Sequence, residues 1–343
     1  MGRFHLPFHW IKPYDDAPRR FPKGPQRQQR MDEHMPGTVL LLGGSGFLGQ
    51  ALAKGLFADR PVRIADRVAP ADPQGANVHY APLDFAAMPD FAPLLCGVEL
   101  VVHLISTTTP AEGTDNLAGE MADNLLPTFR LLDGMVRLPR APKLLFVSSG
   151  GTVYGESKGT PSSEREAAAP ICKYAVHKLA IEKYIHLYHA VHGLDYRVAR
   201  LANPYSARAF FAKNQGAIPI FIELMRQRKP IIVWGDGRQQ RDYIHIDDAL
   251  AGIGAILGYG GPERVFNVGA GVGVSTNELL SLIAGELGAA APDVRYTAAR
   301  ACDVRANRLD ISLLKACTGW EPRISLREGI RRCVEETGGR VDG

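Results

Sequence analysis

A short apolar run that ends in a cluster of glycines constrains the fold of this chain more than any other feature of its sequence. The run is Thr38–Leu42, and glycine occupies four of the next seven positions: Gly43, Gly44, Gly46 and Gly49. Consecutive apolar and β-branched residues predict a buried strand, and the spacing of apolar residues from Phe47 to Phe57 predicts a helix directly after it. A strand, a tight glycine turn and a helix in this order are typical of α/β proteins.

The alternation of strand and helix patterns continues along the chain to about residue 200. Four further short runs predict strands: Val62–Ala65, Leu100–Ile105, Leu144–Val147 and Tyr196–Arg200. Helical patterns lie before the last two of these strands, at Asp123–Val136 and Tyr174–Val191. Because strands that alternate with crossover helices form a parallel sheet covered on both faces, we expect an α/β fold with a doubly wound parallel sheet.

The glycine turn has the chemistry to hold a pyrophosphate. Glycines allow a tight turn and close backbone approach, and the start of a helix supplies N–H donors and a positive dipole. A G-x-G-x-x-G match begins at Gly44, and a G-x-x-G-x-x-G match begins at Gly43. Asp66 ends the second strand 23 residues after Gly43, where its carboxylate can bind a ribose 2′-hydroxyl and repel a 2′-phosphate, which favours NAD over NADP. The spacing of Asp84 fits a residue at the adenine edge or an exposed loop acid equally well.

These patterns divide the chain into three parts. Residues 37–202 are expected to form a Rossmann-like NAD-binding domain, with a return segment near 240–265. After residue 202 the pattern loosens into short elements, such as Ile218–Arg228 (helix), Ile231–Val233 and Val265–Asn267 (strands), which suits a smaller C-terminal substrate-binding lobe over 203–343. Residues 1–36 contain six prolines and no apolar periodicity, so we expect a disordered or loosely docked extension.

Composition argues against several other classes of protein. The 343 residues include 40 basic and 36 acidic side chains, and 45% are hydrophobic, as in ordinary globular proteins. Outside the basic first 30 residues, 33 basic and 34 acidic side chains nearly cancel, which argues against nucleic acid as a partner. The uncharged stretch Ala249–Pro262 is shorter than the roughly 20 residues of a membrane span and predicts a core helix. Five scattered cysteines without a C-x-x-C pair predict no metal site, no disulfide framework and a cytoplasmic location.

A Tyr-x-x-x-Lys pair lies on the helix predicted at Tyr174–Val191. Tyr174 and Lys178 are four residues apart and therefore share one helix face. A phenol with a pKa of about 10 is a poor base, but a nearby ammonium and an oxidised nicotinamide would favour the phenolate and lower that pKa. An amphipathic helix with an exposed lysine is the alternative interpretation. The glycine turn upstream favours the catalytic one.

Residues 37–335 resemble an extended short-chain dehydrogenase/reductase of the NAD-dependent nucleotide-sugar epimerase/dehydratase family, and are most similar to its UDP-glucose 4-epimerase-like members. The motifs follow in the family's order: Gly43–Gly49, His103-Leu104, Asn124, Ser148–Gly155 (SSGGTVYG), Tyr174/Lys178, Asn203-Pro204-Tyr205, Gly235-Asp236-Gly237, Arg241-Asp242-Tyr243-Ile244-His245, Asn267-Val268-Gly269, and Arg300-Ala301-Cys302-Asp303 with Asp310. The Tyr-x-x-x-Lys motif is typical of the superfamily, and the Arg-Asp-Tyr block is typical of the sugar-nucleotide branch.

The resemblance implies a role for each matched residue. NAD would be held by Gly43, Gly46, Phe47, Leu48, Gly49, Asp66, Asp84, Leu104 and Asn124, with Tyr174 and Lys178 touching the nicotinamide ribose. The diphosphate of a nucleotide sugar would be bound by Asn203, Arg241 and Arg300, and Asp303 would lie near its ribose. Guanidiniums can bind a pyrophosphate in bidentate fashion, although ion-paired surface arginines are the alternative. Asn307 would line the sugar pocket, where its small size predicts tolerance of an N-acetyl group at C2.

The turn SSGGTVYG departs from the family in one respect. Members usually carry Ser or Thr four residues before the tyrosine of this turn, where it binds the reacting sugar hydroxyl, but this chain has Gly150. We expect Ser149 to supply the hydroxyl, with Thr152 or water as alternatives. The 4,6-dehydratases carry an Asp-Glu pair at the next two positions, which here are Gly151 and Thr152, so elimination lacks its acid and base.

We therefore predict NAD-dependent epimerisation at C4 of a nucleotide-activated hexose, with UDP as the expected nucleotide, through a transient 4-keto sugar. One alternative is an NAD(P)-dependent nucleotide-sugar reductase or dehydratase of the same family. The other is a catalytically weak NAD-binding sensor or scaffold, which Gly150 keeps open. By resemblance alone, we also expect a homodimer and a place in polysaccharide biosynthesis.

Overall fold

The computed structural model describes residues 37–70, 77–109, 116–156, 159–207, 216–300 and 303–339. The chain divides into two units, Met1–Met35 and Pro36–Gly343. The extension that we predict over residues 1–36 lies outside the described residues.

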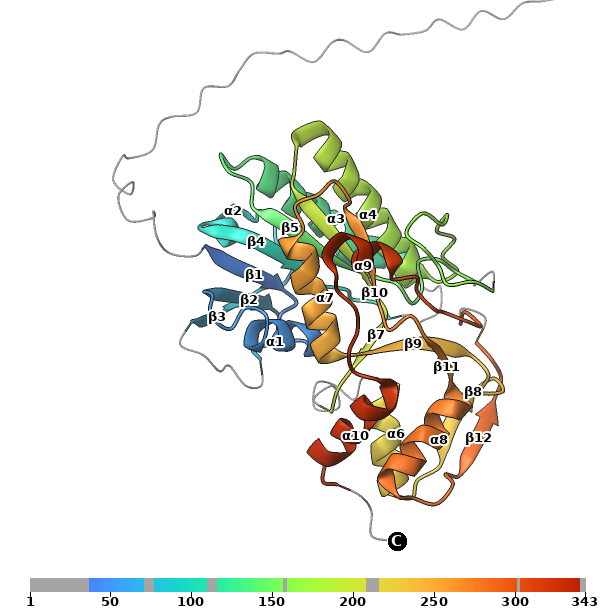
Figure 1. Cartoon of the computed structure of the whole chain (residues 1–343). Helices are drawn as coiled ribbons and strands as arrows, with labels where there is room; N and C mark the ends of the chain where they lie inside the picture. Colours follow the sequence, from blue (N-terminus) through green and yellow to red (C-terminus); the bar gives the residue numbers. More distant parts are fainter. Residues whose placement is uncertain are drawn as a thin grey trace, which may run out of the picture. The chain divides into compact units, whose positions relative to one another are not determined.

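A seven-stranded parallel sheet is the centre of the second unit (Figure 1), in the order β10-β6-β5-β4-β1-β2-β3. Its strands are β1 (Thr38–Leu42), β2 (Val62–Asp66), β3 (Val78–Pro82), β4 (Val98–His103), β5 (Lys143–Ser149), β6 (Tyr196–Leu201) and β10 (Val265–Val268). The predicted α/β fold with a Rossmann-like, doubly wound sheet is confirmed.

One strand lies in a different place from the one we expected. We predicted a return segment to the main domain near 240–265 and listed Val265–Asn267 among the elements of the smaller lobe, but β10 pairs with β6 at the edge of the main sheet, with Phe266 beside Ala199. Phe266 and Val268 are fully buried in the main core. Hydrophobic burial therefore brings this part of the chain back to the sheet, which a run of four residues with three apolar side chains cannot reveal by itself.

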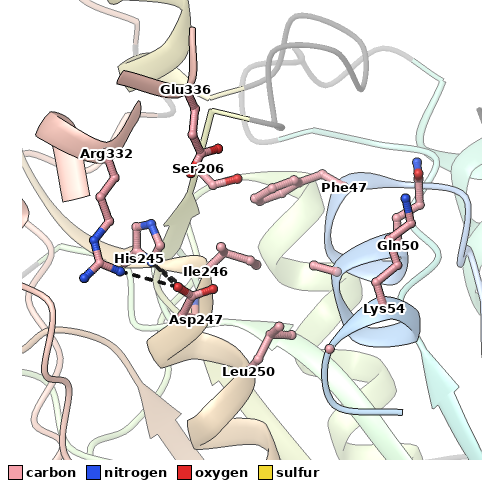
Figure 2. Close-up of a pocket in the computed structure, with 12 residues that line it drawn as sticks. Phe47, Gln50, Lys54, Ser206, His245, Ile246, Asp247, Leu250, Arg332 and Glu336 are labelled. Carbon is pink, nitrogen blue, oxygen red and sulfur yellow. Dashed lines mark hydrogen bonds and ion pairs between the residues drawn. The ribbon is translucent and has the colours of Figure 1, made fainter. Parts of the chain in front are cut away.

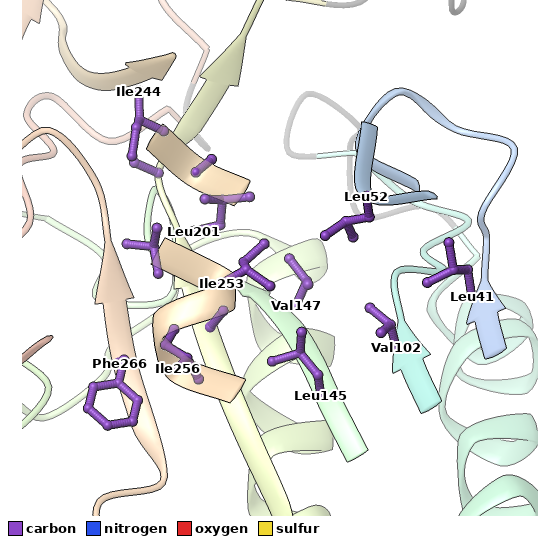
Figure 3. Packing of buried hydrophobic residues seen from close by; sticks show 14 of the residues in the cluster. Leu41, Leu52, Val102, Leu145, Val147, Leu201, Ile244, Ile253, Ile256 and Phe266 are labelled. Atoms are coloured by element: carbon purple, nitrogen blue, oxygen red, sulfur yellow. The ribbon is translucent and has the colours of Figure 1, made fainter. Parts of the chain in front are cut away.

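Helices cover both faces of the sheet. One face carries α1 (Phe47–Lys54), α7 (Ile246–Gly258) and α9 (Ser312–Thr318), and the other carries α2 (Ala92–Leu95), α3 (Leu117–Val136) and α4 (Lys173–His192). Figure 3 shows Ile253 of α7 beside Val147 of the sheet. Helix α1 ends earlier than predicted because Gly55 closes it. Helix α3 begins earlier than predicted because Asn116 caps it, accepting a hydrogen bond from the N–H of Gly119.

A smaller lobe with its own core follows β6. It contains a sheet of β7 (Asn203–Tyr205), β9 (Gln240–His245) and β11 (Gly273–Ser275), and a parallel pair of β8 (Ile231–Trp234) and β12 (Val294–Thr297). Helices α6 (Ala217–Arg226), α8 (Thr276–Leu287) and α10 (Leu326–Glu336) pack together beside these strands. A capping box of Ser275 and Glu278 starts α8.

A buried ion pair joins the sheet to α4. The guanidinium of Arg200 in β6 contacts the Glu182 carboxylate at 2.6 Å, and both side chains are about 5% exposed. Ser148 donates a hydrogen bond to the same carboxylate, and Arg200 donates to the Tyr154 hydroxyl at 3.0 Å. The pair therefore holds both ends of the SSGGTVYG turn against β6 and α4.

We expect Glu182→Gln to lower the free energy of unfolding by about 3–5 kcal/mol, because it leaves the Arg200 guanidinium buried without a counter-charge. Urea denaturation of the full chain measures the change. Glu321→Gln is the control, because Glu321 pairs with Lys315 at an exposed site and its loss should leave stability unchanged. Equal effects of the two substitutions would contradict this account.

Candidate active site

Glycine is present at three positions of the first turn for three different structural reasons. Gly43 has a φ of +80°, a left-handed conformation that favours glycine. A Cβ on Gly49 would lie 2.4 Å from the Cα of Gly44, so the helix can approach the turn this closely only without a side chain. A Cβ on Gly46 would meet only the carbonyl oxygen of Gly43, at 3.5 Å, so the backbone there is open to a ligand. The structure thus gives a reason for each glycine of the G-x-x-G-x-x-G spacing.

The start of α1 fits a dinucleotide pyrophosphate. No side chain caps this end of the helix, and its first turn contains no acidic residue, so its N–H groups and dipole favour an anion. Asp66, at the end of β2, accepts hydrogen bonds from the N–H groups of Ser45 (3.1 Å) and Arg67 (2.7 Å). These bonds fix the carboxylate beside the turn, and its oxygens have further lone pairs for a ribose hydroxyl.

The other predicted cofactor residues lie at the same edge of the sheet. Asp84 is exposed two residues after the end of β3, which pairs with β2. Leu104 follows β4, and its N–H donates to the carbonyl of Leu42 at 2.9 Å. Asn124 of α3 is buried, accepts a hydrogen bond from the N–H of Thr107 and donates one to the Thr107 hydroxyl. Asn124 therefore holds the loop after β4 from behind.

Three hydroxyls meet at the end of β5. Thr152 donates a hydrogen bond to the Ser149 hydroxyl at 2.8 Å, and the Ser149 side chain in turn hydrogen-bonds the Tyr174 phenol. All three side chains are partly exposed. The predicted catalytic tyrosine thus lies beside the hydroxyl that we expected to replace the missing one at Gly150.

The ionisation of this tyrosine differs from our expectation. Burial raises the pKa of Tyr174 to about 12, and the hydrogen bond with Ser149 opposes that rise only in part. The ammonium of Lys178 lies 5.8 Å from the centre of the Tyr174 ring and donates to the carbonyl of Val147 at 2.9 Å. The protein's own groups therefore do not lower the Tyr174 pKa as expected, because burial raises it by more than the hydrogen bond with Ser149 lowers it.

Lys178 itself is almost fully buried, with 4% of its surface exposed. Burial lowers the pKa of its ammonium to about 8, and the Glu182 carboxylate opposes that change. At neutral pH the lysine is therefore mostly protonated, and it carries a positive charge on the face of α4 that it shares with Tyr174.

The space beside Gly150 is filled by residues from outside the turn. A Cβ at this position would lie 2.6 Å from a methyl group of Leu309 and 2.7 Å from the carbonyl oxygen of Arg200. The carbonyl of Gly150 accepts a hydrogen bond from the Asn307 side-chain amide at 2.8 Å. The family's usual hydroxyl has no room here, whereas a Cβ on Gly151 would have no neighbour closer than 3.7 Å.

The two arginines predicted to bind a diphosphate line one small cavity of about 160 Å³. Arg300 contacts Asp303 at 2.9 Å, and Arg241 lies 3.9 Å from the same carboxylate. Two guanidiniums and one carboxylate leave a net positive charge in the cavity. Both arginines are therefore ion-paired, as the alternative interpretation expected, but they also face the same space.

The same cavity contains residues that we did not predict. Trp234 lies under the Arg300 guanidinium, 5.3 Å from ring centre to carbon, and Phe221 and Tyr243 complete an aromatic lining. A sequence signal for Trp234 was available, because this tryptophan directly precedes the motif Gly235-Asp236-Gly237. An aromatic surface beside two cations suits a base joined to phosphates.

Asn203 and Asn307 lie between the arginine cavity and the turn Ser148–Gly155, the predicted catalytic turn. The Asn203 amide donates to the carbonyl of Asp242 at 2.9 Å, and its side chain is the nearest group to the open side of Gly151. Asn307 is 3% exposed and does not line the arginine cavity. The arginine cavity therefore does not support the predicted place of Asn307 in a sugar pocket.

A larger cavity of about 320 Å³ lies elsewhere (Figure 2). It is lined by one face of α1, by the start of α7 and by Arg332 and Glu336 of α10. Of the predicted site residues, only Phe47 borders it. Size alone would select this cavity, but the hydroxyl and arginine groups needed for the predicted chemistry lie outside it.

Within the described parts of the chain, no group of three or more His, Cys, Asp or Glu side chains is arranged to hold a metal ion. Over the same residues, no helix is long and apolar enough to cross a membrane.

Comparison with known proteins gives consistent matches. The family described as the NAD dependent epimerase/dehydratase family matches residues 39–269. A curated relative, the UDP-glucose 4-epimerase of Mycolicibacterium smegmatis, is 32% identical over 310 residues, which cover 87% of this chain and 97% of the relative.

Solved structures agree in fold over nearly the same length. The UDP-glucose 4-epimerase of Thermotoga maritima, solved with UDP-glucose, is 29% identical with a TM-score of 0.80 and covers 88% of this chain and 98% of its own. The UDP-glucose 4-epimerase of Thermus thermophilus, solved with NAD, is 27% identical with a TM-score of 0.79, over 89% and 100%.

We expect Gly150→Ser to destabilise the protein and to lower its activity, because the new Cβ would collide with Leu309 and a backbone carbonyl. The cost should be about 1–3 kcal/mol, measured by urea denaturation. Gly151→Ser is the matched control: it adds the same side chain one residue later, where space is open, and should leave stability nearly unchanged. A stable and more active Gly150→Ser variant would show that the position can still take the usual hydroxyl.

Proposed function

Because the chain belongs to the NAD-dependent epimerase/dehydratase family, we propose that it inverts C4 of a nucleotide-activated hexose, with a UDP-sugar as substrate. The observation that carries the proposal is the contact between Ser149 and Tyr174. Ser149 belongs to the turn Ser148–Gly155, which has no carboxylic acid. This arrangement supplies a proton acceptor for a sugar hydroxyl but lacks the acid and base that elimination of water requires.

The residues around the first glycine turn would hold the cofactor. The open backbone at Gly46 and the start of α1 would bind the pyrophosphate, and Asp66 would bind the adenosine ribose. When bound, NAD would supply reversible hydride transfer at C4 with no net consumption of the cofactor. Lys178, positively charged beneath the site, would hold the nicotinamide ribose together with Tyr174.

Tyr174 would take the proton of the sugar 4-hydroxyl, which leaves a transient 4-keto sugar. Ser149 already hydrogen-bonds the phenol, and Thr152 donates to Ser149. This pair of hydroxyls can orient the sugar hydroxyl and share the proton with the phenol. We therefore assign Ser149 the role that Ser or Thr usually fills at the position of Gly150.

Arg241 and Arg300 would bind the diphosphate, with Asn203 between them and the catalytic turn. A firm grip on the nucleotide end leaves the sugar free to turn about its diphosphate link, which inversion of C4 requires. Asp303 pairs with both arginines and orients them. The cavity therefore keeps a net positive charge that would attract a diphosphate, although neither guanidinium is unpaired. UDP as the nucleotide is supported by the names of the relatives described above.

We expect Tyr174→Phe to lower kcat for C4 inversion by roughly 100- to 10,000-fold, because it removes the proton acceptor. Ser149→Ala should cost less, about 10- to 100-fold, because Thr152 and water remain. Conversion of UDP-glucose to UDP-galactose, followed by chromatography, measures both rates. Unchanged turnover in Tyr174→Phe would contradict the catalytic role of this tyrosine, whereas no turnover in the wild type would favour a binding protein.

A screen of sugar nucleotides separates the remaining reactions. An epimerase interconverts C4 isomers with no net change in NADH, whereas a reductase consumes NADH in proportion to product. We expect inversion of UDP-glucose and also of UDP-N-acetylglucosamine, since Asn307 is smaller than an aromatic residue. Turnover of UDP-glucose without any turnover of the N-acetyl sugar would contradict the second expectation.

We also propose that two copies of the chain associate through α3 and α4. These helices pack together, and several of their large apolar side chains are exposed: Leu117, Met121, Leu126, Val176, Tyr184, Leu187 and Val191. An apolar surface of this kind is typical of a protein interface. A four-helix contact between two copies would bury it.

Light scattering should give twice the chain mass for the wild type at micromolar concentration. Leu187→Asp should shift the protein towards a monomer, because a charge would enter the apolar interface. Val272→Asp changes an equally exposed apolar residue of the smaller lobe and should leave the mass unchanged. A wild-type monomer would refute the proposal.

A further inference from the structure

The segment 303–310 extends from the two arginines to the catalytic turn and is bonded at both ends. We infer that this linking segment sets the position of the catalytic turn relative to the diphosphate arginines, and that Asn307 is the positioning residue through which it does so. The inference rests on the proposed function, because it concerns how the two halves of that site are kept in register.

One end of the linking segment belongs to the arginine cavity. Asp303 pairs with Arg300 and Arg241, as described above. The next residue, Val304, accepts a hydrogen bond from the Arg241 guanidinium at its backbone carbonyl, at 2.7 Å. A change in the position of either arginine therefore acts directly on the segment.

The middle of the segment lies along β9 like an added strand. The N–H of Gln240 donates to the carbonyl of Arg305 at 2.9 Å, and the N–H of Asn307 donates back to the carbonyl of Gln240 at 3.0 Å. The backbone N–H of Leu309 then donates to the Asp242 carboxylate at 3.1 Å. These bonds fix the register of the segment beside the strand that carries Arg241.

Asp242 is the anchor of this arrangement. It is fully buried, and its carboxylate also accepts the backbone N–H groups of Ala270 and Gly271. Its backbone carbonyl accepts the side-chain amide of Asn203. Three N–H donors on one carboxylate make this a rigid attachment, because hydrogen bonds to a charged acceptor are among the stronger ones.

The other side of the segment contacts the catalytic turn. The Asn307 amide donates to the carbonyl of Gly150, and the Leu309 side chain fills the space beside that glycine. Two flanking bonds continue the contact: the N–H of Arg305 donates to the Glu156 carboxylate, and the N–H of Ser162 donates to the carbonyl of Arg308 at 2.9 Å. Gly150 directly follows Ser149, so the segment controls where the Ser149 hydroxyl lies.

Packing alone does not explain an asparagine at position 307. Its amide oxygen is buried and has no hydrogen-bond partner among the described residues. A buried polar atom without a partner is costly, and an apolar side chain of similar size would avoid that cost. The hydrogen bond to Gly150 is the contact that such a replacement would lose.

Asn307→Leu tests this role, because it keeps the volume and removes the hydrogen bond. We expect kcat for C4 inversion to fall about tenfold, as for the loss of one buried hydrogen bond, while the inhibition constant of UDP stays within about twofold of the wild type. Asn277→Leu is the matched control: Asn277 also donates to a backbone carbonyl of this lobe, but at an exposed site. It should change neither constant. A parallel loss of UDP affinity and melting temperature in Asn307→Leu would mean a merely structural role.

A second measurement does not depend on activity. Hydrogen exchange of the backbone amides of residues 149–155 is followed with and without UDP, which lacks the hexose and so leaves the hexose site free. In the wild type, UDP should slow exchange at this turn, and in Asn307→Leu this effect should be lost although UDP still binds.

The outcomes separate the two ideas. A wild type that inverts sugars but shows no effect of UDP on the turn would overturn the linking role and leave the proposed function standing. A wild type that inverts no sugar but transmits UDP binding to the turn would overturn the proposed function alone.

Discussion

The ion pair between Arg200 and Glu182 is the interaction on which the site depends most. Two opposite charges share a space that water barely reaches, and each would be costly to bury alone. Because Arg200 lies in β6 and Glu182 in α4, the pair fixes the helix that carries Tyr174 and Lys178 against the sheet. Its further bonds to Ser148 and Tyr154 hold the catalytic turn between the two elements.

Much of the central sheet and many of the candidate residues could be predicted because they are encoded locally. The strand, glycine turn and helix at residues 38–54 follow from apolar spacing and from backbone conformations that only glycine adopts readily. The Tyr174 and Lys178 pair follows from helical periodicity. The pairing of the strand at Val265–Val268 does not, because four residues, three of them apolar, carry no information about the strand that they join.

The rest of the site depends on contacts between distant parts of the chain. Gly150 looks like a lost hydroxyl in the sequence, but Leu309 and Asn307, more than 150 residues away, occupy its surroundings. Ser149 and Tyr174 share a hydrogen bond only because α4 packs beside β5. Such contacts arise from packing, and no spacing in the sequence reports them.

The high pKa of Tyr174 makes the ionised fraction of its phenol depend strongly on nearby charge. At a pKa of about 12, about one phenol in 100,000 is ionised at pH 7. A positive charge about 4 Å from the oxygen contributes about 4 kcal/mol at an effective dielectric constant of 20, which lowers a pKa by about 3. The ionised fraction then rises about a thousandfold. The ammonium of Lys178, 5.8 Å from the centre of the Tyr174 ring, does not offset the effect of burial. If Tyr174 is the base proposed above, burial of its phenol would make its strength as a base depend on a cation that arrives with the ligand, such as an oxidised nicotinamide.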